Sequence, residues 1–147
     1  MKSLFNQQDN NELLERIERL SPTSAALWGK MNVAQMLSHL QEPIKVAFGE
    51  EKLKHSWIGK LFGKIAKRKM MKDEFSKNLP TAPTFVRKDE RNFDEEKAKL
   101  IPMIRKFTEG PGVLSQEPHP FFGKLTTEEW DILGWKHIDH HLRQFGV

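Results

Sequence analysis

The amino-acid sequence predicts an all-α protein, a four-helix bundle with a long crossover between its second and third helices. Wherever apolar residues recur with a clear period, they are spaced by three and four residues, as on one face of an α-helix. Four such stretches form the predicted main helices of the 147-residue chain. The connection between the second and the third is far longer than the turns that join neighbouring helices of a simple bundle, which indicates a crossover.

The length and composition predict one domain over residues 1–147, because a chain of this size closes a single hydrophobic core. It contains no cysteine, so disulfides, thiolate ligands and a cysteine nucleophile are excluded, and a metal would be held by imidazole and carboxylate. Neither the apolar core of a signal peptide nor a run of about 18 apolar residues is found. We therefore expect a soluble, cytoplasmic protein.

The first two helices are predicted from their apolar stripes. The first covers residues 10–20, "NNELLERIERL", and is ended by Ser21 and Pro22. The second begins after Asn32, a favourable N-cap residue, and runs through "VAQMLSHLQEPIKVAFGE", in which Pro43 is a possible site of a kink.

The last two helices are predicted from capping patterns. One begins near Asn92, with Glu95 as the capping-box partner, and ends at the Gly-Pro-Gly of residues 110–112. The other follows Thr126, which forms a capping box with Glu129 ahead of "WDILGWKHIDHHLRQF".

The crossover is predicted to contain residues 52–72, which hold eight lysines and arginines and no acid, and the proline-containing connection 80–92. Helically spaced apolar residues in the basic stretch are compatible with an interfacial helix on an anionic membrane or with a nucleic-acid surface; these residues are Ile58, Leu61, Phe62 and Ile65. We favour a crossover whose apolar side closes one end of the bundle and whose lysines are solvated. The expectation is no stable membrane association and no nucleic acid partner.

Three of the six histidines lie close together near the end of the chain: His137, His140 and His141. Either His137/His140 or His137/His141 has a spacing that could chelate one ion. The apolar stripe of the helix distinguishes between the two pairs. On a helical wheel His137 and His141 lie roughly 100° and 60° from Ile138, whereas His140 lies about 160° from it, toward water. His137 and His141 are therefore the inward pair.

A third ligand has to come from another helix, and His39 lies beside the apolar stripe of the second one. His55 and His119, in a connection and a loop, are weaker candidates. Three neutral imidazoles with a vacant position are typical of a catalytic zinc-type site. The alternative is that these histidines are hydrogen-bonded core residues that hold no metal.

Two stretches, "WGKMNVAQMLSHL" and "HPFFGKLTTEEWDILGWKHIDHHLRQFG", resemble the DinB/YfiT-like superfamily of metal-binding four-helix bundles, and within it an uncharacterised subgroup. The resemblance covers nearly the whole chain, including "NLPTAP" at residues 78–83. It implies that His39, His137 and His141 are the metal ligands, and that Arg143 and Gln144 are the residues that often follow the last of them.

The resemblance implies a divalent metal cofactor, zinc or nickel, and a metal-dependent hydrolase or thiol transferase that acts on a small-molecule substrate. A non-catalytic metal-stabilised binding or sensing bundle is the alternative, and a homodimer is expected because related bundles often pair. The chain departs from zinc hydrolases with an H-E-x-x-H motif, since no glutamate stands beside the ligand pair and Asp139 points away from the ion. The general base is not identified.

Overall fold

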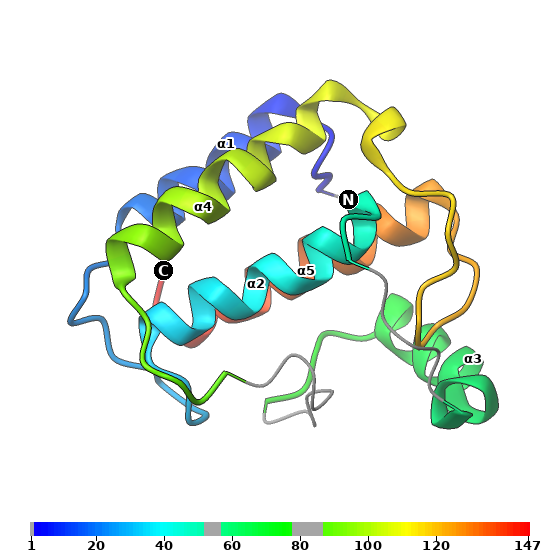
Figure 1. The fold of residues 1–147 in the computed structure, drawn as a ribbon, viewed down its shortest axis with the longest axis horizontal. Coiled ribbons are helices and arrows are strands. Elements are labelled where there is room, and N and C mark those ends of the chain that lie inside the picture. The colour runs from blue at the N-terminus through cyan, green and yellow to red at the C-terminus, as the bar shows by residue number, and fades with distance from the viewer. Residues whose placement is uncertain (1, 52–56, 78–86) are drawn as a thin grey trace.

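A computed structural model describes residues 2–51, 57–77 and 87–147, and of residues 57–62 it describes the backbone only. Regular structure in these ranges is helical, without strands, which confirms the all-α class (Figure 1). The α-helices are α1 (Gln7–Glu18), α2 (Val33–Phe48), α3 (Trp57–Lys72), α4 (Phe93–Lys106) and α5 (Thr127–Gln144), with short 3-10 turns η2 (Phe107–Glu109) and η3 (Pro111–Val113) after α4.

The helix starts follow local capping chemistry. Thr126 forms the predicted capping box with Glu129, and Asn32, predicted only as an N-cap residue, forms one with Gln35. In each box the cap side chain accepts from the backbone N–H of the third helical residue, and the cap backbone N–H donates to that residue's side chain. The Asn92 side chain accepts from the backbone N–H of Glu95 at 3.0 Å. Helix α1 begins earlier than predicted, at Gln7, because the side chain of Asn6 satisfies two backbone N–H groups of the first turn.

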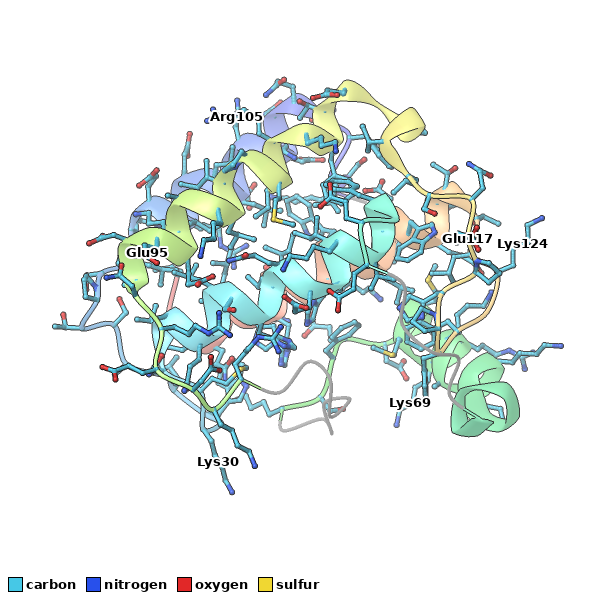
Figure 2. All side chains as sticks on the ribbon, viewed as in Figure 1. Lys30, Lys69, Glu95, Arg105, Glu117 and Lys124 are labelled. Atoms are coloured by element: carbon cyan, nitrogen blue, oxygen red, sulfur yellow. The ribbon has the colours of Figure 1, made fainter. Side chains whose placement is uncertain are left out.

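Helices α1, α2, α4 and α5 surround the core. Helix α2 packs against α4 and α5, and α1 packs against the same two helices (Figure 1). Fully buried apolar side chains from all four meet between them: Leu13, Ile17, Met36, Leu37, Leu40, Leu100, Ile104, Ile138 and Leu142. Charged side chains such as Lys69, Glu95 and Arg105 project outward (Figure 2).

Helix α2 runs through Pro43 and ends at Phe48, and Gly49 then adopts a left-handed conformation with φ of 73°. Such a residue at the end of a helix favours glycine, which has no Cβ. Pro43 does not end the helix, so α2 is continuous from Val33 to Phe48 and carries both His39 and the residues that face α4.

The crossover between α2 and α4 contains α3, which packs against α5 (Figure 1). Its lysines and arginine at 64, 68, 69 and 72 are exposed, as predicted, whereas Lys67 forms an ion pair with Glu129 at 2.7 Å. The expectation that Ile65 helps close the bundle is wrong, because this side chain is 69% exposed. The side chains of Ile58, Leu61 and Phe62 lie outside the described residues.

In the part of the chain that the structure describes, no helix combines the length and the apolar character needed to cross a bilayer.

Candidate metal centre

Three histidines from two helices converge between α2 and α5. His39 comes from the middle of α2, and His137 and His141 lie one turn apart on α5. One ring nitrogen from each lies within 4.8 Å of the others, and the Nε2 atoms of His39 and His137 are 3.0 Å apart. The structure thus brings together the three residues that the sequence analysis selected, in an arrangement that could hold a metal ion.

The apolar stripe of α5 selects this pair as predicted, since Ile138, Leu142 and Phe145 are all buried. The expectation that His140 faces water is wrong, because it is only 7% exposed. Its ring meets the edge of the Trp28 ring, with centroids 5.7 Å apart, and lies 6.0 Å from that of Phe75. His140 is covered by these two aromatic rings, and it is not part of the histidine cluster.

Gln144 fixes the orientation of His141. The Nε2 atom of Gln144 donates to the backbone carbonyl of Trp28 at 2.6 Å, and its Oε1 atom lies 2.7 Å from Nδ1 of His141. A carbonyl oxygen can only accept, so the amide presents its own oxygen to His141, and Nδ1 must carry the proton. The neutral ring then has an unprotonated Nε2 atom, as a metal ligand requires.

Gly29 permits this close approach. Its φ is 83°, and a Cβ atom there would lie 2.5 Å from Nε2 of Gln144. A side chain at this position would therefore displace the amide that orients His141.

The cluster favours neutral imidazole. Burial lowers the pKa of His141 to about 3, with a contribution from the neighbouring His39. The pKa of His137 is lowered well below its ordinary value by burial and by the other histidines. Because a protonated imidazole cannot bind a cation, both rings are ready to act as ligands at neutral pH without losing a proton. The donor set fits a divalent zinc- or nickel-like ion, for which imidazole is a suitable ligand.

The remaining candidates have other roles or lie outside the description. Nδ1 of His119 accepts hydrogen bonds from the backbone N–H groups of Phe121 and Phe122, both at 3.1 Å, and burial lowers its pKa to about 4. His119 is thus a loop-forming residue. Asp139 pairs with Arg16 at 2.8 Å and with Arg143 at 3.1 Å, away from the cluster. His55 lies outside the described residues.

The sequence did not predict a role for two residues near the cluster. Phe75 packs against His137, with ring centroids 6.1 Å apart, and Lys136 binds backbone carbonyls at the end of α3. Phe75 is distant from the histidines in sequence, and a lysine on a helix flank is ordinarily solvated. No local pattern could have identified either residue.

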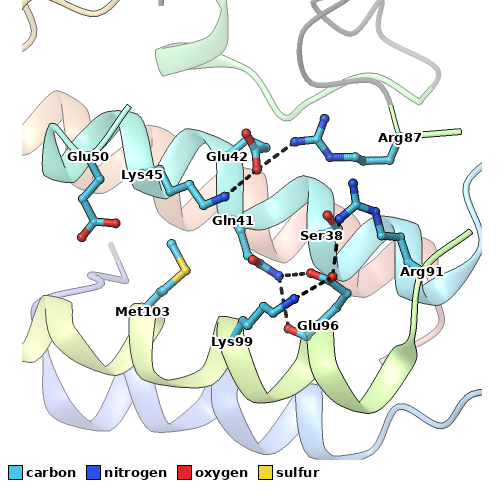
Figure 3. Close-up of a pocket in the computed structure, with 10 residues that line it drawn as sticks. All are labelled: Ser38, Gln41, Glu42, Lys45, Glu50, Arg87, Arg91, Glu96, Lys99 and Met103. Carbon is cyan, nitrogen blue, oxygen red and sulfur yellow. Dashed lines mark hydrogen bonds and ion pairs between the residues drawn. The ribbon is translucent and has the colours of Figure 1, made fainter. Parts of the chain in front are cut away.

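A second polar feature is a cavity of about 560 Å³ between α2 and α4 (Figure 3). Buried Glu42 pairs with Lys45 at 2.9 Å and with Arg87 at 2.8 Å. Buried Glu96 accepts from Gln41 at 2.7 Å and from Lys99 at 3.2 Å. None of the residues that line the cavity is a histidine. The hydrogen bond from Gln41 to Glu96 joins α2 to α4, and the ion pair of Glu42 with Arg87 joins α2 to the chain that leads into α4. The cavity is therefore separate from the candidate metal centre.

Fold and site together define an all-helical protein with a buried three-histidine cluster that could hold a metal ion. Residues 2–146 match a family described as "Protein of unknown function (DUF1569)", and the chain belongs to this family. In comparisons with curated proteins and with solved structures, none matched the chain.

Proposed function

We propose that this protein is a four-helix bundle of the DinB/YfiT-like type that binds a divalent zinc- or nickel-like ion through His39, His137 and His141. The observation that carries the proposal is the convergence of three imidazoles from α2 and α5, with burial and Gln144 favouring the neutral, ligand-competent form of His141. An ion bound to three histidines keeps an open position at which it can activate water or a thiol or carbonyl substrate.

The chain's own residues support a reactive centre more than a closed structural one. Among the residues that the structure describes, three ligands converge, fewer than the four of a structural zinc site. His137 is the partly exposed member of the cluster, so a small-molecule substrate has a way to approach from its side. A metal-dependent hydrolase or thiol transferase is the activity that this arrangement favours. Asp139 is paired with two arginines, so it is not placed to serve as the general base.

A non-catalytic role is the second candidate. The cluster joins α2 to α5 inside the bundle, and Gln144 links it to the backbone of Trp28. An ion bound there would cross-link α2 to α5, and the protein would be a metal-stabilised binding or sensing bundle. Turnover of thioester, amide and thiol-acceptor substrates that depends on the bound ion would favour the enzyme, and stabilisation without turnover would favour the second role.

The test of the metal site is zinc and nickel titration of the metal-free protein, with metal content measured by mass spectrometry. We expect His39→Ala, His137→Ala and His141→Ala each to weaken binding by more than the roughly 10–100-fold that loss of an outer-shell partner costs. His140→Phe is the matched control, because it removes a neighbouring imidazole yet keeps a ring between Trp28 and Phe75.

Loss of metal in His140→Phe together with retention in His141→Ala would overturn the ligand assignment. A wild-type protein that binds neither zinc nor nickel would overturn the metal proposal altogether.

A further inference from the structure

The chain that leaves α3 passes over the histidine cluster. Residues 73–77 follow α3, and Phe75 within them packs against two neighbouring rings of α5. Its centroid lies 6.1 Å from that of His137 and 6.0 Å from that of His140. His137 is the partly exposed member of the cluster, so the Phe75 ring lies against the member that solvent can reach.

Lys136 holds the start of this 73–77 segment. Its Nζ atom donates to the backbone carbonyls of Met70 at 3.1 Å, Met71 at 2.7 Å and Asp73 at 3.0 Å. The last carbonyls of a helix have no partner within the helix, and a positive charge near them is favourable. Lys136 therefore caps α3 from a different helix, and it is the residue immediately before His137.

Other contacts hold the rest of the segment. Glu74 pairs with Arg143 at 3.1 Å, but both side chains are largely exposed, and such pairs contribute little. The ammonium group of Lys77 lies 4.6 Å from the centroid of the Trp28 ring. The His140 side chain also forms a hydrogen bond with the backbone of Phe75. Lys136 thus holds the start of the segment through three hydrogen bonds, and His140 contributes to holding Phe75 itself.

We propose that Lys136 is a positioning residue that holds the 73–77 segment in place, so that Phe75 covers the accessible side of the histidine cluster and controls approach to it. The effect on a bound ion rests on the proposed function, whereas the effect on the histidines themselves does not. A substrate that approaches the ion past His137 would then meet an aromatic face, which favours one with an apolar group beside its reacting atom.

The first experiment uses the metal-free protein and does not depend on a metal. Diethylpyrocarbonate modifies accessible neutral imidazoles, and peptide mass spectrometry reports each histidine. We expect Lys136→Met and Phe75→Ala to raise modification of His137 several-fold, while Lys136→Arg, which retains donors and charge, stays close to wild type. Lys69→Met, an exposed lysine of α3, is the matched control. Buried His119 reports global unfolding, since its reactivity should stay low in a folded variant.

The second experiment measures how fast an excess of chelator removes zinc from the loaded protein. Release several-fold faster in Lys136→Met and in Phe75→Ala, but not in Lys136→Arg or Lys69→Met, is the expected result. Unchanged His137 reactivity in a folded Phe75→Ala variant would overturn the cover. Reactivity that rises in Phe75→Ala but not in Lys136→Met would overturn the role of Lys136. If His137 reactivity rises in the variants while zinc leaves at the wild-type rate, control of approach to the ion is overturned. If the wild-type protein binds no zinc, only the proposed function fails.

Discussion

At the scale of single residues, Gln144 decides which nitrogen of His141 is available to an ion. The amide NH₂ group of Gln144 donates to the backbone carbonyl of Trp28, and the amide oxygen accepts from Nδ1 of His141. His141 is therefore held in the tautomer protonated at Nδ1, whose unprotonated Nε2 atom can act as a metal ligand. His141 and Gln144 are buried and Trp28 is partly buried, so competition from water for these hydrogen bonds is small.

Replacing Gln144 tests this directly. Gln144→Leu removes the acceptor for Nδ1 and should weaken zinc binding by roughly 10–100-fold, the usual cost of losing an outer-shell partner. Gln144→Glu keeps an acceptor for His141 but cannot donate to Trp28, so we expect it to retain more affinity than Gln144→Leu. Competition titration with a chromophoric chelator measures both constants. Equal affinities for wild type and Gln144→Leu would show that Gln144 does not orient the ligand.

The histidines also show what sequence can predict at this scale. The choice of His137 and His141 over His140 follows from helix geometry and the apolar stripe, which are local properties of α5. The burial of His140 depends on Trp28 and Phe75, which come from two other parts of the chain. No helical wheel contains that information, so the expected exposure of His140 was wrong although the selected pair meets His39.

At the scale of helices, the starts were more predictable than the packing. Asn32 and Thr126 satisfy backbone groups within three residues, so the capping boxes depend on sequence alone. The docking of α3 depends on a distant loop: a Cβ atom on Gly63 would overlap the backbone carbonyl oxygen of Phe121. A glycine within an apolar helical pattern gives no indication of which segment approaches it.

Gly63→Ala tests that docking. Alanine would ordinarily stabilise a helix interior relative to glycine by up to about 1 kcal/mol. Because the new methyl group meets backbone at Phe121, we expect the opposite sign, with a lower melting temperature. Gly134→Ala in α5 is the control, since its Cβ would meet the movable end of the Leu4 side chain at 2.7 Å. Thermal melts compare the two, and a Gly63→Ala protein at least as stable as Gly134→Ala would contradict the close contact between α3 and the loop.

At the scale of the whole molecule, two sets of buried groups make stability depend on pH. Burial raises the pKa of Glu96, but hydrogen bonds from Gln41 and Lys99 and nearby positive charge lower it by more, so its net pKa lies below the ordinary value. Its contribution is therefore present above the pKa of the unfolded chain and is lost as pH falls through the lower folded value. The buried histidines act in the same direction at higher pH, because unfolding releases them to take up protons.

Acid should accordingly destabilise the metal-free protein well above the range where carboxylates titrate. His119 and His141 have folded pKa values of about 4 and about 3 against an ordinary value of 6.5. For these two groups the unfolded state therefore binds about one more proton than the folded state at pH 6.5 and nearly two more at about pH 5. Each proton contributes about 1.4 kcal/mol per pH unit, which gives a fall in the free energy of unfolding of roughly 3 kcal/mol per pH unit near pH 5. Urea denaturation at pH 7.5, 6.5, 5.5 and 5.0 measures this slope, and His141→Gln should reduce it by about one proton's share.

Saturating zinc should raise stability at pH 7.5 and steepen the fall, because protons compete with the ion for the same imidazoles. A free energy of unfolding that stays constant from pH 6.5 to 5.0 would mean that these histidines are not held neutral by burial.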